Sequence, residues 1–160
     1  LHIGLKGTMN ALFLKDLADK TRRGLRGRVE LGRSGGGKCY GYDIVKSDER
    51  GKRVINVPHA AVVQRIFEEY ASGKSPKAIA FQLNKEGVPG PSGKGRGQST
   101  INGNRQRGTG LLNNELYVGR LVWNRLRYIK DPETGKRVSR LNPEDPGPYT
   151  HLTRPPNREV

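Results

Sequence analysis

Apolar residues at helical spacing predict two short helices near the middle of the chain. In VPHAAVVQRIFEEYASG, Pro58 stands in the first turn, Gly73 ends the helix, and the inward positions are Val62, Val63, Ile66, Phe67 and Tyr70. In SPKAIAFQLNKEGV, Ser75 caps a second helix, Gly87 stops it, and the inward positions are Ile79, Ala80 and Leu83. The tight SGKS link leaves two interpretations open, the helix pair of a helix-turn-helix or a plain αα-hairpin.

Helical spacing also occurs at the start of the chain, from an N-cap at Thr8 to about Leu25. The buried stripe of this helix is expected to hold Met9, Leu12, Phe13, Leu17 and Leu25. The following stretch, KTRRGLRGRVELGRSGGGK, loses the apolar positions and gains glycines, each of which costs a helix about 1 kcal/mol relative to alanine. The pattern therefore predicts a helix that runs out into a flexible basic segment. That segment is either a strap along a nucleic-acid groove or an ordinary linker.

Alternating and short apolar runs predict strands elsewhere. Residues 40–45 and 53–57 are expected to be short strands around a polar turn. Residues 116–130 read as one longer strand, and GKRVSRLNP pairs with it across the turn DPETGK. On this strand Trp123 is expected in the core, and a basic edge suited to phosphates is formed by Arg120, Arg125, Arg127 and Lys130. After Asn142 the chain is rich in proline and is expected to be extended.

The stretch GQSTINGNRQRGTG has few apolar residues and no acid. Ser99 or Thr100 is expected to cap a helix that begins near Ile101. Its outward positions would be Asn102, Asn104, Arg105, Gln106 and Arg107. Arginine pairs with guanine edges, and asparagine or glutamine pairs with adenine edges, so this helix would suit the major groove of a duplex. The alternative is a polar surface helix whose amides only cap turns.

Charge narrows the choice of partner. The 160 residues carry a formal net charge of +15, which favours polyanions, nucleic acid above all. The excess lies in two blocks, net +6 over residues 1–40 and net +9 over residues 73–130, with neutral segments after each. A chain kept soluble by charge mixes both signs, so two separate blocks indicate two contact surfaces.

Other features bound the location and chemistry of the protein. A single cysteine, Cys39, excludes a disulfide framework, and no apolar run reaches the roughly 20 residues of a membrane span. The start LHIGLKGTMNALFL has neither an initiator Met nor a signal-peptide layout, so we read the chain as a fragment of a longer protein. His2, His59 and His151 are scattered without metal-ligand spacing, and Ser34 precedes three glycines without the rest of a phosphate loop. Cys39, with no obvious base, is expected to be a buried small hydrophobe, and no catalytic residue, metal or cofactor is predicted.

Several motifs together resemble one family. The motif GYD (residues 41–43) follows the glycines at 35–37, and VPHAAVVQRIF (57–67) begins the first of the two short helices. The motif STI (99–101) begins the polar stretch, and LNNELYVGR (112–120) follows it. Over residues 7–143 the chain resembles the recombinase domain of large serine recombinases, preceded by the end of the last long helix of their catalytic domain. The resemblance implies DNA cleavage by a serine that becomes esterified to the 5′ phosphate, followed by strand exchange within a tetramer.

The resemblance also implies that the nucleophile belongs to an upstream domain. None of the serines of this chain is therefore expected to act as nucleophile, namely Ser34, Ser47, Ser72, Ser75, Ser92, Ser99 and Ser139. In the full family a cysteine-bearing zinc ribbon follows the recombinase domain. The sequence given departs from that pattern, because its one cysteine, Cys39, stands before the domain.

The expected fold is α+β, a small helix-turn-helix-like domain with a short antiparallel sheet, preceded by a long helix and a basic glycine-rich linker. Residues 1–27 would end the long helix, 28–39 form the flexible linker, 40–143 form the DNA-binding domain, and 144–160 form an extended tail. The resemblance further implies that residues 28–38 follow a minor groove and that residues 99–107 reach a major groove.

The expected function is sequence-specific binding to duplex DNA at a recombination half-site. The full-length protein would be a homodimer or tetramer, cytoplasmic and associated with the nucleoid, serving DNA integration or a related recombination. The candidate DNA contacts are Arg22, Arg23, Arg26, Arg28, Arg33, Lys38, Lys94, Arg96, Ser99, Thr100, Asn102, Asn104, Arg105, Arg107, Arg125 and Arg127. The alternative from another class is a structural RNA-binding protein such as a ribosomal component. An enzyme that acts alone on nucleic acid is a third possibility.

Overall fold

The computed structural model describes residues 2–46, 50–142 and 152–153. The helices are α1 (His2–Glu30), α2 (Val57–Ala71), α3 (Pro76–Lys85) and α4 (Gln98–Asn102), with a short 3-10 helix η1 (Glu115–Val118). Antiparallel pairs join β1 (Tyr42–Ile44) to β2 (Arg53–Ile55), β3 (Leu121–Val122) to β6 (Leu152–Thr153), and β4 (Leu126–Lys130) to β5 (Arg137–Leu141). The expected α+β class is confirmed.

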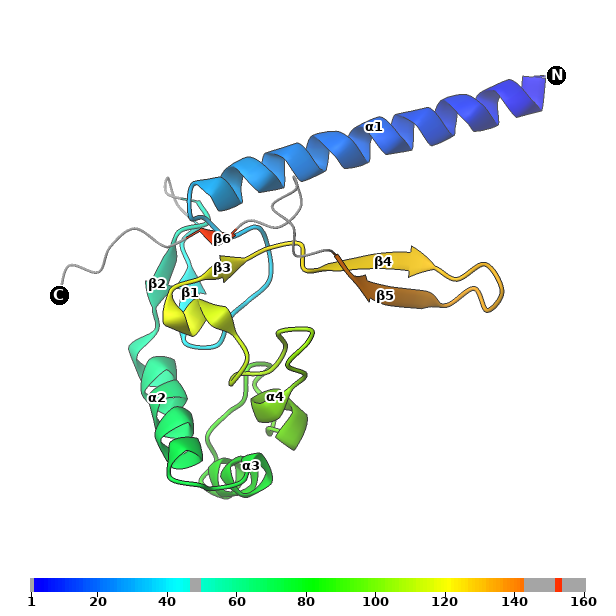
Figure 1. Ribbon diagram of the computed structural model, residues 1–160. Helices are drawn as coiled ribbons and strands as arrows, with labels where there is room; N and C mark the ends of the chain where they lie inside the picture. Colours follow the sequence, from blue (N-terminus) through cyan, green and yellow to red (C-terminus); the bar gives the residue numbers. More distant parts are fainter. Residues whose placement is uncertain (1, 47–49, 143–151, 154–160) are drawn as a thin grey trace.

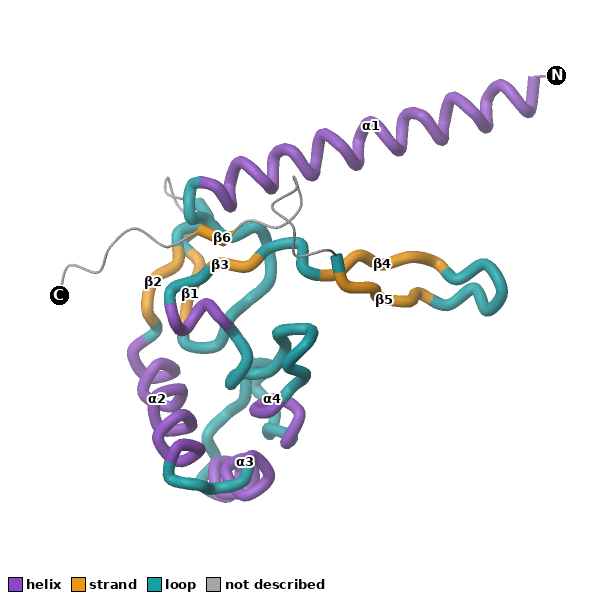
Figure 2. Tube along the Cα trace, viewed as in Figure 1, coloured by secondary structure: helices purple, strands orange, loops and turns teal. Residues whose placement is uncertain are grey.

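Two elements project from a small body. The body holds α2, α3, α4 and the short strands, whereas α1 and the β4–β5 hairpin both extend to the same side in Figure 1. The hairpin projects from the body as a two-stranded ribbon, as the tube in Figure 2 shows. Its residues Tyr128, Ile129, Val138 and Leu141 are all at least 40% exposed. The antiparallel registers confirm both the hairpin across DPETGK and the β1–β2 pair, although β1 and β2 are shorter than expected.

One core holds the body together. It comprises Tyr40, Val63, Ile66, Ile79, Ala80, Leu83, Ile101 and Leu111. These residues come from the segment before β1, from α2, α3 and α4, and from the loop after α4. The inward positions expected for α2 and α3 are confirmed, except that Tyr70 is 46% exposed.

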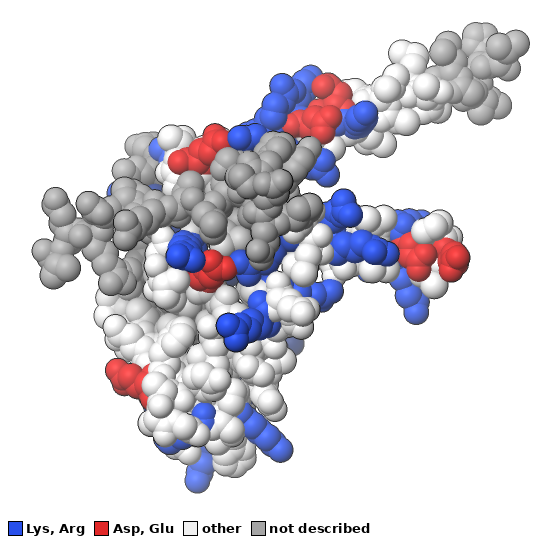
Figure 3. All heavy atoms as spheres, in the orientation of Figure 1, with Lys and Arg blue, Asp and Glu red and all other residues white. Residues whose placement is uncertain are grey.

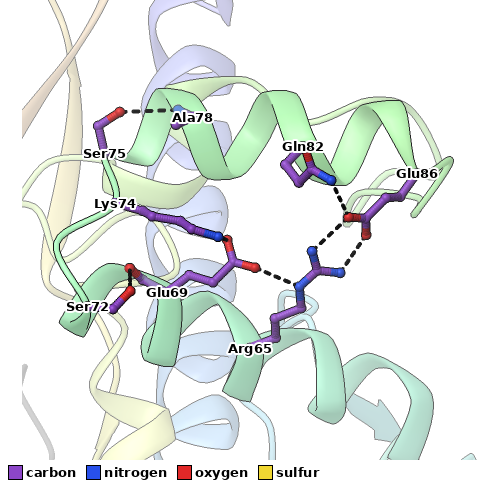
Figure 4. Close-up of polar contacts among 8 residues, drawn as sticks. All are labelled: Arg65, Glu69, Ser72, Lys74, Ser75, Ala78, Gln82 and Glu86. Atoms are coloured by element: carbon purple, nitrogen blue, oxygen red, sulfur yellow. Dashed lines mark hydrogen bonds and ion pairs between the residues drawn. The ribbon is translucent and has the colours of Figure 1, made fainter.

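An ion-pair network links α2 to the residue that follows α3 and to the link between the helices (Figure 4). Arg65 on α2 donates from Nε to Glu69 and from Nη2 to Glu86 Oε1, at 2.7 and 2.8 Å. Lys74 joins Glu69 at 3.3 Å from the link between the helices. The Arg65 guanidinium lowers the pKa of Glu86 to about 2, from 4.5. The expected Ser75 cap is confirmed, because Ser75 Oγ accepts a hydrogen bond from Ala78 N at 3.2 Å.

The first helix differs from the expectation at both ends. It is helical from His2 to Glu30, so the cap at Thr8 and the end near Leu25 are wrong. Two factors offset the helix-breaking glycines near its end, the full burial of Val29 and the Arg26–Glu30 ion pair at 2.9 Å. The expected stripe is not buried within this chain, since Met9, Leu12, Phe13 and Leu17 are 50–65% exposed.

The segment between α1 and β1, residues 31–41, is packed where it leaves the helix. Ser34 N donates to Gly51 O at 2.7 Å, and Ser34 is buried. A Cβ at Gly35 would stand 2.7 Å from Val29 Cγ2 and 2.9 Å from Trp123 Cδ1, so only glycine fits between these two side chains. The start of this connecting segment is therefore ordered structure that joins α1 to the body, and Trp123 is half-buried at the junction.

Residues 116–130 do not form one strand, contrary to the expectation. They are divided among η1, β3 and β4 by two residues with positive φ, Gly119 at +83° and Asn124 at +58°. An alternating pattern shows which residues suit a strand, but it does not show where the backbone reverses. Of the extended tail, β6 pairs with β3 and the rest lies outside the described residues.

Membrane-spanning helices and clusters of metal-binding side chains are both absent from the part of the chain that the structure describes. None of its helices combines the length and the apolar character that crossing a membrane requires. No group of three or more His, Cys, Asp or Glu side chains there could hold a metal ion.

Candidate nucleic-acid interface

The expected base-reading helix is mostly a turn. Helix α4 begins at Gln98, with Gly97 at its N-cap and no side-chain cap, and it ends at Asn102. Asn104 then bridges Thr109, so residues 103–110 form a tight polar turn. Gly103 makes this reversal possible, because its φ is +56° and a Cβ there would stand 1.9 Å from Thr109 O. The helix expected from Ile101 onward, with Ser99 or Thr100 as its cap, is therefore wrong.

The polar side chains of this stretch nevertheless face outward. Asn102, Asn104, Arg105 and Gln106 are exposed. Asn104 Oδ1 accepts a hydrogen bond from Arg107 N at 3.0 Å, so this amide caps the turn, as the alternative interpretation held. Ser99 is exposed and Thr100 half-buried on α4. The guanidinium and amide groups of this stretch are therefore accessible to a ligand, although a turn and not a helix carries most of them.

Two arginines tie the turn to its neighbours. Arg107 donates to Ser139 Oγ on β5, which links the turn to the hairpin. Arg125 pairs with Glu115, and its guanidinium lies directly against Gly108. Arg125 is therefore half-buried and partly neutralised, whereas Arg127 is exposed on β4.

A cavity of about 220 Å³ lies where the connecting segment, β2, the polar turn, η1 and β3 meet. We call it the basic pocket. Its charged lining residues are Lys38, Arg53, Arg107, Arg120, Arg125 and Glu115. Lys38 belongs to the first basic block of the sequence, and Arg107 belongs to the second. The fold thus brings the two blocks together at one site.

The hairpin carries like charges directly opposite one another. Arg127 pairs with Arg140, and Lys130 pairs with Arg137, in the β4–β5 register. Like charges in opposed positions destabilise a sheet unless counter-charge is supplied. In Figure 3 basic side chains lie along part of α1, along the hairpin and on the body beside it, with acidic side chains on α1 and at the tip of the hairpin. The visible face is therefore suited to a polyanion.

Arg96, an expected DNA contact, is only 3% exposed, so that assignment is wrong. Its guanidinium stacks over the Tyr40 ring at 4.8 Å and donates to Val88 O at 3.1 Å. Asn84 binds both its backbone N and its backbone O, at 2.7 and 2.8 Å. Arg96 therefore anchors the loop before α4 to the core.

The remaining expected contacts are accessible. Arg22, Arg23 and Arg28 are exposed on α1, and Arg26 is half-buried beside Glu30. Arg33 and Lys38 are exposed on the connecting segment, and Lys94 is exposed on the loop before α4. Arg28 also lines a second cavity of about 400 Å³, together with Ser34, Lys46 and Arg50.

Sequence reasoning missed three cations of this face, Arg53, Arg137 and Arg140. The hairpin register could have supplied Arg137 and Arg140, because the turn DPETGK already sets which residues oppose Lys130 and Arg127. No sequence signal could have supplied Arg53, because its place beside Lys38 depends on the tertiary packing of β2.

The sequence model of the Recombinase family matches residues 58–153, more than half of the chain. The chain belongs to the Recombinase family. The matched recombinase domain runs from α2 to β6 and so includes the helix pair, the polar turn and the hairpin. Helix α1 and the connecting segment precede the match. No curated protein and no solved structure matches the chain.

Proposed function

We propose that the chain binds duplex DNA at a recombination half-site, as the DNA-binding part of a serine site-specific recombinase. One observation carries the proposal, the meeting of the two basic blocks at the basic pocket through Lys38 and Arg107. A duplex presents phosphates along a continuous surface, and a protein that neutralises them gains affinity by releasing counterions. A single cationic surface meets this requirement better than two separate ones.

The hairpin supports the same proposal. Its opposed cation pairs, Arg127 with Arg140 and Lys130 with Arg137, repel each other in the free protein. Phosphates placed beside them would supply the missing counter-charge. A two-stranded ribbon also fits the major groove, which is about 12 Å wide.

Each exposed segment has a separate role in this proposal. Asn102, Asn104 and Arg105 contact base edges, and the connecting segment follows a minor groove. The phosphate contacts are Arg22, Arg23, Arg26, Arg28, Arg33, Lys38, Lys94, Ser99, Thr100, Arg107, Arg125 and Arg127. The helix-turn-helix-like pair α2–α3 is the scaffold that holds α4 and the turn in place.

The proposal extends to the whole recombinase. The exposed apolar stripe of α1 would pack against another subunit of a dimer or tetramer, because stripes of this kind seldom stay exposed to water. A domain upstream of α1 would supply the nucleophilic serine, and the protein would work on the nucleoid in the cytoplasm.

Selection from a pool of random duplexes tests the proposal. We expect a common sequence to be enriched, with a log–log salt slope of about −5 or steeper if six or more phosphates are neutralised. Arg105→Ala should relax the preference at a cost of about 1–3 kcal/mol. Arg23→Ala should weaken all sequences alike.

A matched control is Lys74→Ala, which removes a cation that is paired with Glu69 between α2 and α3. It should leave both the preference and the slope unchanged. Absence of any enriched sequence would refute base reading by the turn. Tighter binding to structured RNA than to duplex DNA would favour the ribosomal alternative.

A further inference from the structure

The basic pocket has more positive charge than the described residues around it can neutralise. Five cations line it against one acid, Glu115. Glu115 is already paired with Arg125. No ion pair to a described carboxylate satisfies Lys38, Arg53 or Arg120. Three uncompensated cations around one cavity are an unfavourable arrangement unless an anion joins them.

Of these three cations, Arg53 gives the strongest indication that an anion binds in the pocket. It is half-buried on β2, and burial lowers the pKa of its guanidinium below the ordinary value. Taking a guanidinium out of water is costly when no anion accompanies it. An oxyanion in the pocket would accept hydrogen bonds from this group and offset that cost.

The pocket has room for a small oxyanion and its water. Its volume of about 220 Å³ corresponds to about seven water molecules at about 30 Å³ each. Gly36 and Gly37 form part of its wall with φ of +121° and +77°, and a Cβ at either would meet nothing within 4 Å. The wall is therefore open backbone that an anion can approach closely.

We propose that the basic pocket binds one phosphate group, a backbone phosphate of duplex DNA, held by Lys38, Arg53 and Arg120. The choice of DNA as the source rests on the proposed function, whereas the affinity for a phosphate does not. Arg107 also lines the pocket and ties it to the hairpin through Ser139. A phosphate bound here would fix the register of the connecting segment and the polar turn on the same strand.

The only cysteine of the chain offers a direct probe. Cys39 lines the pocket and is half-buried, and its Sγ accepts a hydrogen bond from Asn114 Nδ2 at 3.0 Å. Alkylation of this thiol by iodoacetamide therefore reports on the pocket alone. Each rate is compared with and without phosphate, at an ionic strength matched by chloride, because the cations also affect the intrinsic reactivity of the thiol.

The first arm uses inorganic phosphate. At about twice its Kd, phosphate should slow alkylation about threefold in the wild-type chain. The double variant Lys38→Ala/Arg120→Ala should lose this protection, and both substituted residues are exposed, so the fold should be retained. Glu115→Gln, which frees Arg125, should strengthen the protection. Lys77→Ala removes an exposed cation on α3, away from the pocket lining, and should leave it unchanged.

The second arm uses a duplex of random sequence. It should protect Cys39, and a duplex with uncharged methylphosphonate linkages should not. Because one phosphate contact is lost, the double variant should lose about one unit of salt slope. Protection by inorganic phosphate without protection by the duplex would overturn the DNA assignment. No protection in either arm would overturn the pocket itself, even if the chain binds DNA. If the chain fails to bind DNA at all, the proposed function falls, and the first arm still decides the pocket.

Discussion

At the scale of single residues, Gly103 decides the shape of the candidate interface. The sequence shows a glycine after a polar, helix-compatible stretch, and it does not show that Thr109 O will lie where a Cβ would be. The outward polar character of the stretch was predictable from composition. The backbone that presents it was not, because it depends on the bridge between Asn104 and Thr109.

Substitution at this position tests the role of the turn. Gly103→Ala should destabilise the chain by about 4 kcal/mol or more, because the backbone itself must move. Gly93→Ala is a matched control, with φ of +77° and nothing within 4 Å of a new Cβ. It should cost only the left-handed backbone strain of about 1–2 kcal/mol. Urea denaturation gives both values, and equal losses would contradict the steric role of Gly103.

Arg96 illustrates a second limit at this scale. Composition treats all arginines of a basic block alike, and nothing in PGPSGKGRGQ separates an exposed cation from a buried one. The distinction comes from Tyr40, which is 56 positions away in sequence yet lies beneath the guanidinium. Contacts between such distant residues are set by the fold.

At the scale of elements, local pattern succeeded where the apolar residues pack against one another. Helices α2 and α3 were predictable because their stripes and stop signals agree. The β4–β5 hairpin was predictable for another reason, the turn DPETGK between two alternating runs, although its apolar residues are exposed. The pattern failed for α1, whose stripe is exposed, and for residues 116–130, where Asn124 at φ +58° interrupts the strand. A pattern identifies apolar faces, but it does not identify what covers them.

The α2–α3 network predicts how stability depends on pH. The folded pKa of Glu86, about 2, lies below the ordinary 4.5, so its contribution is complete above pH 4.5 and is lost as the pH falls toward 2. The thermal midpoint should therefore drop over this range, and less so in Glu86→Gln. Glu68→Gln, an exposed neighbour on α2 outside the network, should follow the wild type. If the thermal midpoint of Glu86→Gln fell with pH as steeply as that of the wild type, the Arg65–Glu86 ion pair would not stabilise the packing of α2 on α3.

At the scale of the whole molecule, α1 presents apolar surface that nothing in the described chain covers. Met9, Leu12 and Phe13 are each more than 60% exposed. Burying a leucine or phenylalanine side chain contributes about 1.5–3 kcal/mol, so a few of them suffice for a specific association.

We expect the isolated chain to associate reversibly, with a Kd that sedimentation equilibrium can measure. Leu12→Ser/Phe13→Ser should weaken this association more than about tenfold, given about 1.4 kcal/mol per factor of ten. Lys20→Ala on the same helix serves as the control. A chain that stays monomeric at millimolar concentration would contradict this use of α1.

The glycine wedged between Val29 and Trp123 has a mechanical consequence. It sets the direction in which a rod of 29 residues leaves the body, and at about 1.5 Å per residue this rod is about 44 Å long. At about 3.4 Å per base pair, that length corresponds to about 13 base pairs of duplex. If a catalytic domain precedes His2, the length of α1 would set the distance along the DNA between the bases that the body contacts and the bond that is cut. A bulkier side chain at position 35 would change the direction of α1 relative to the body, while leaving the helix and the DNA-contacting residues themselves unaltered.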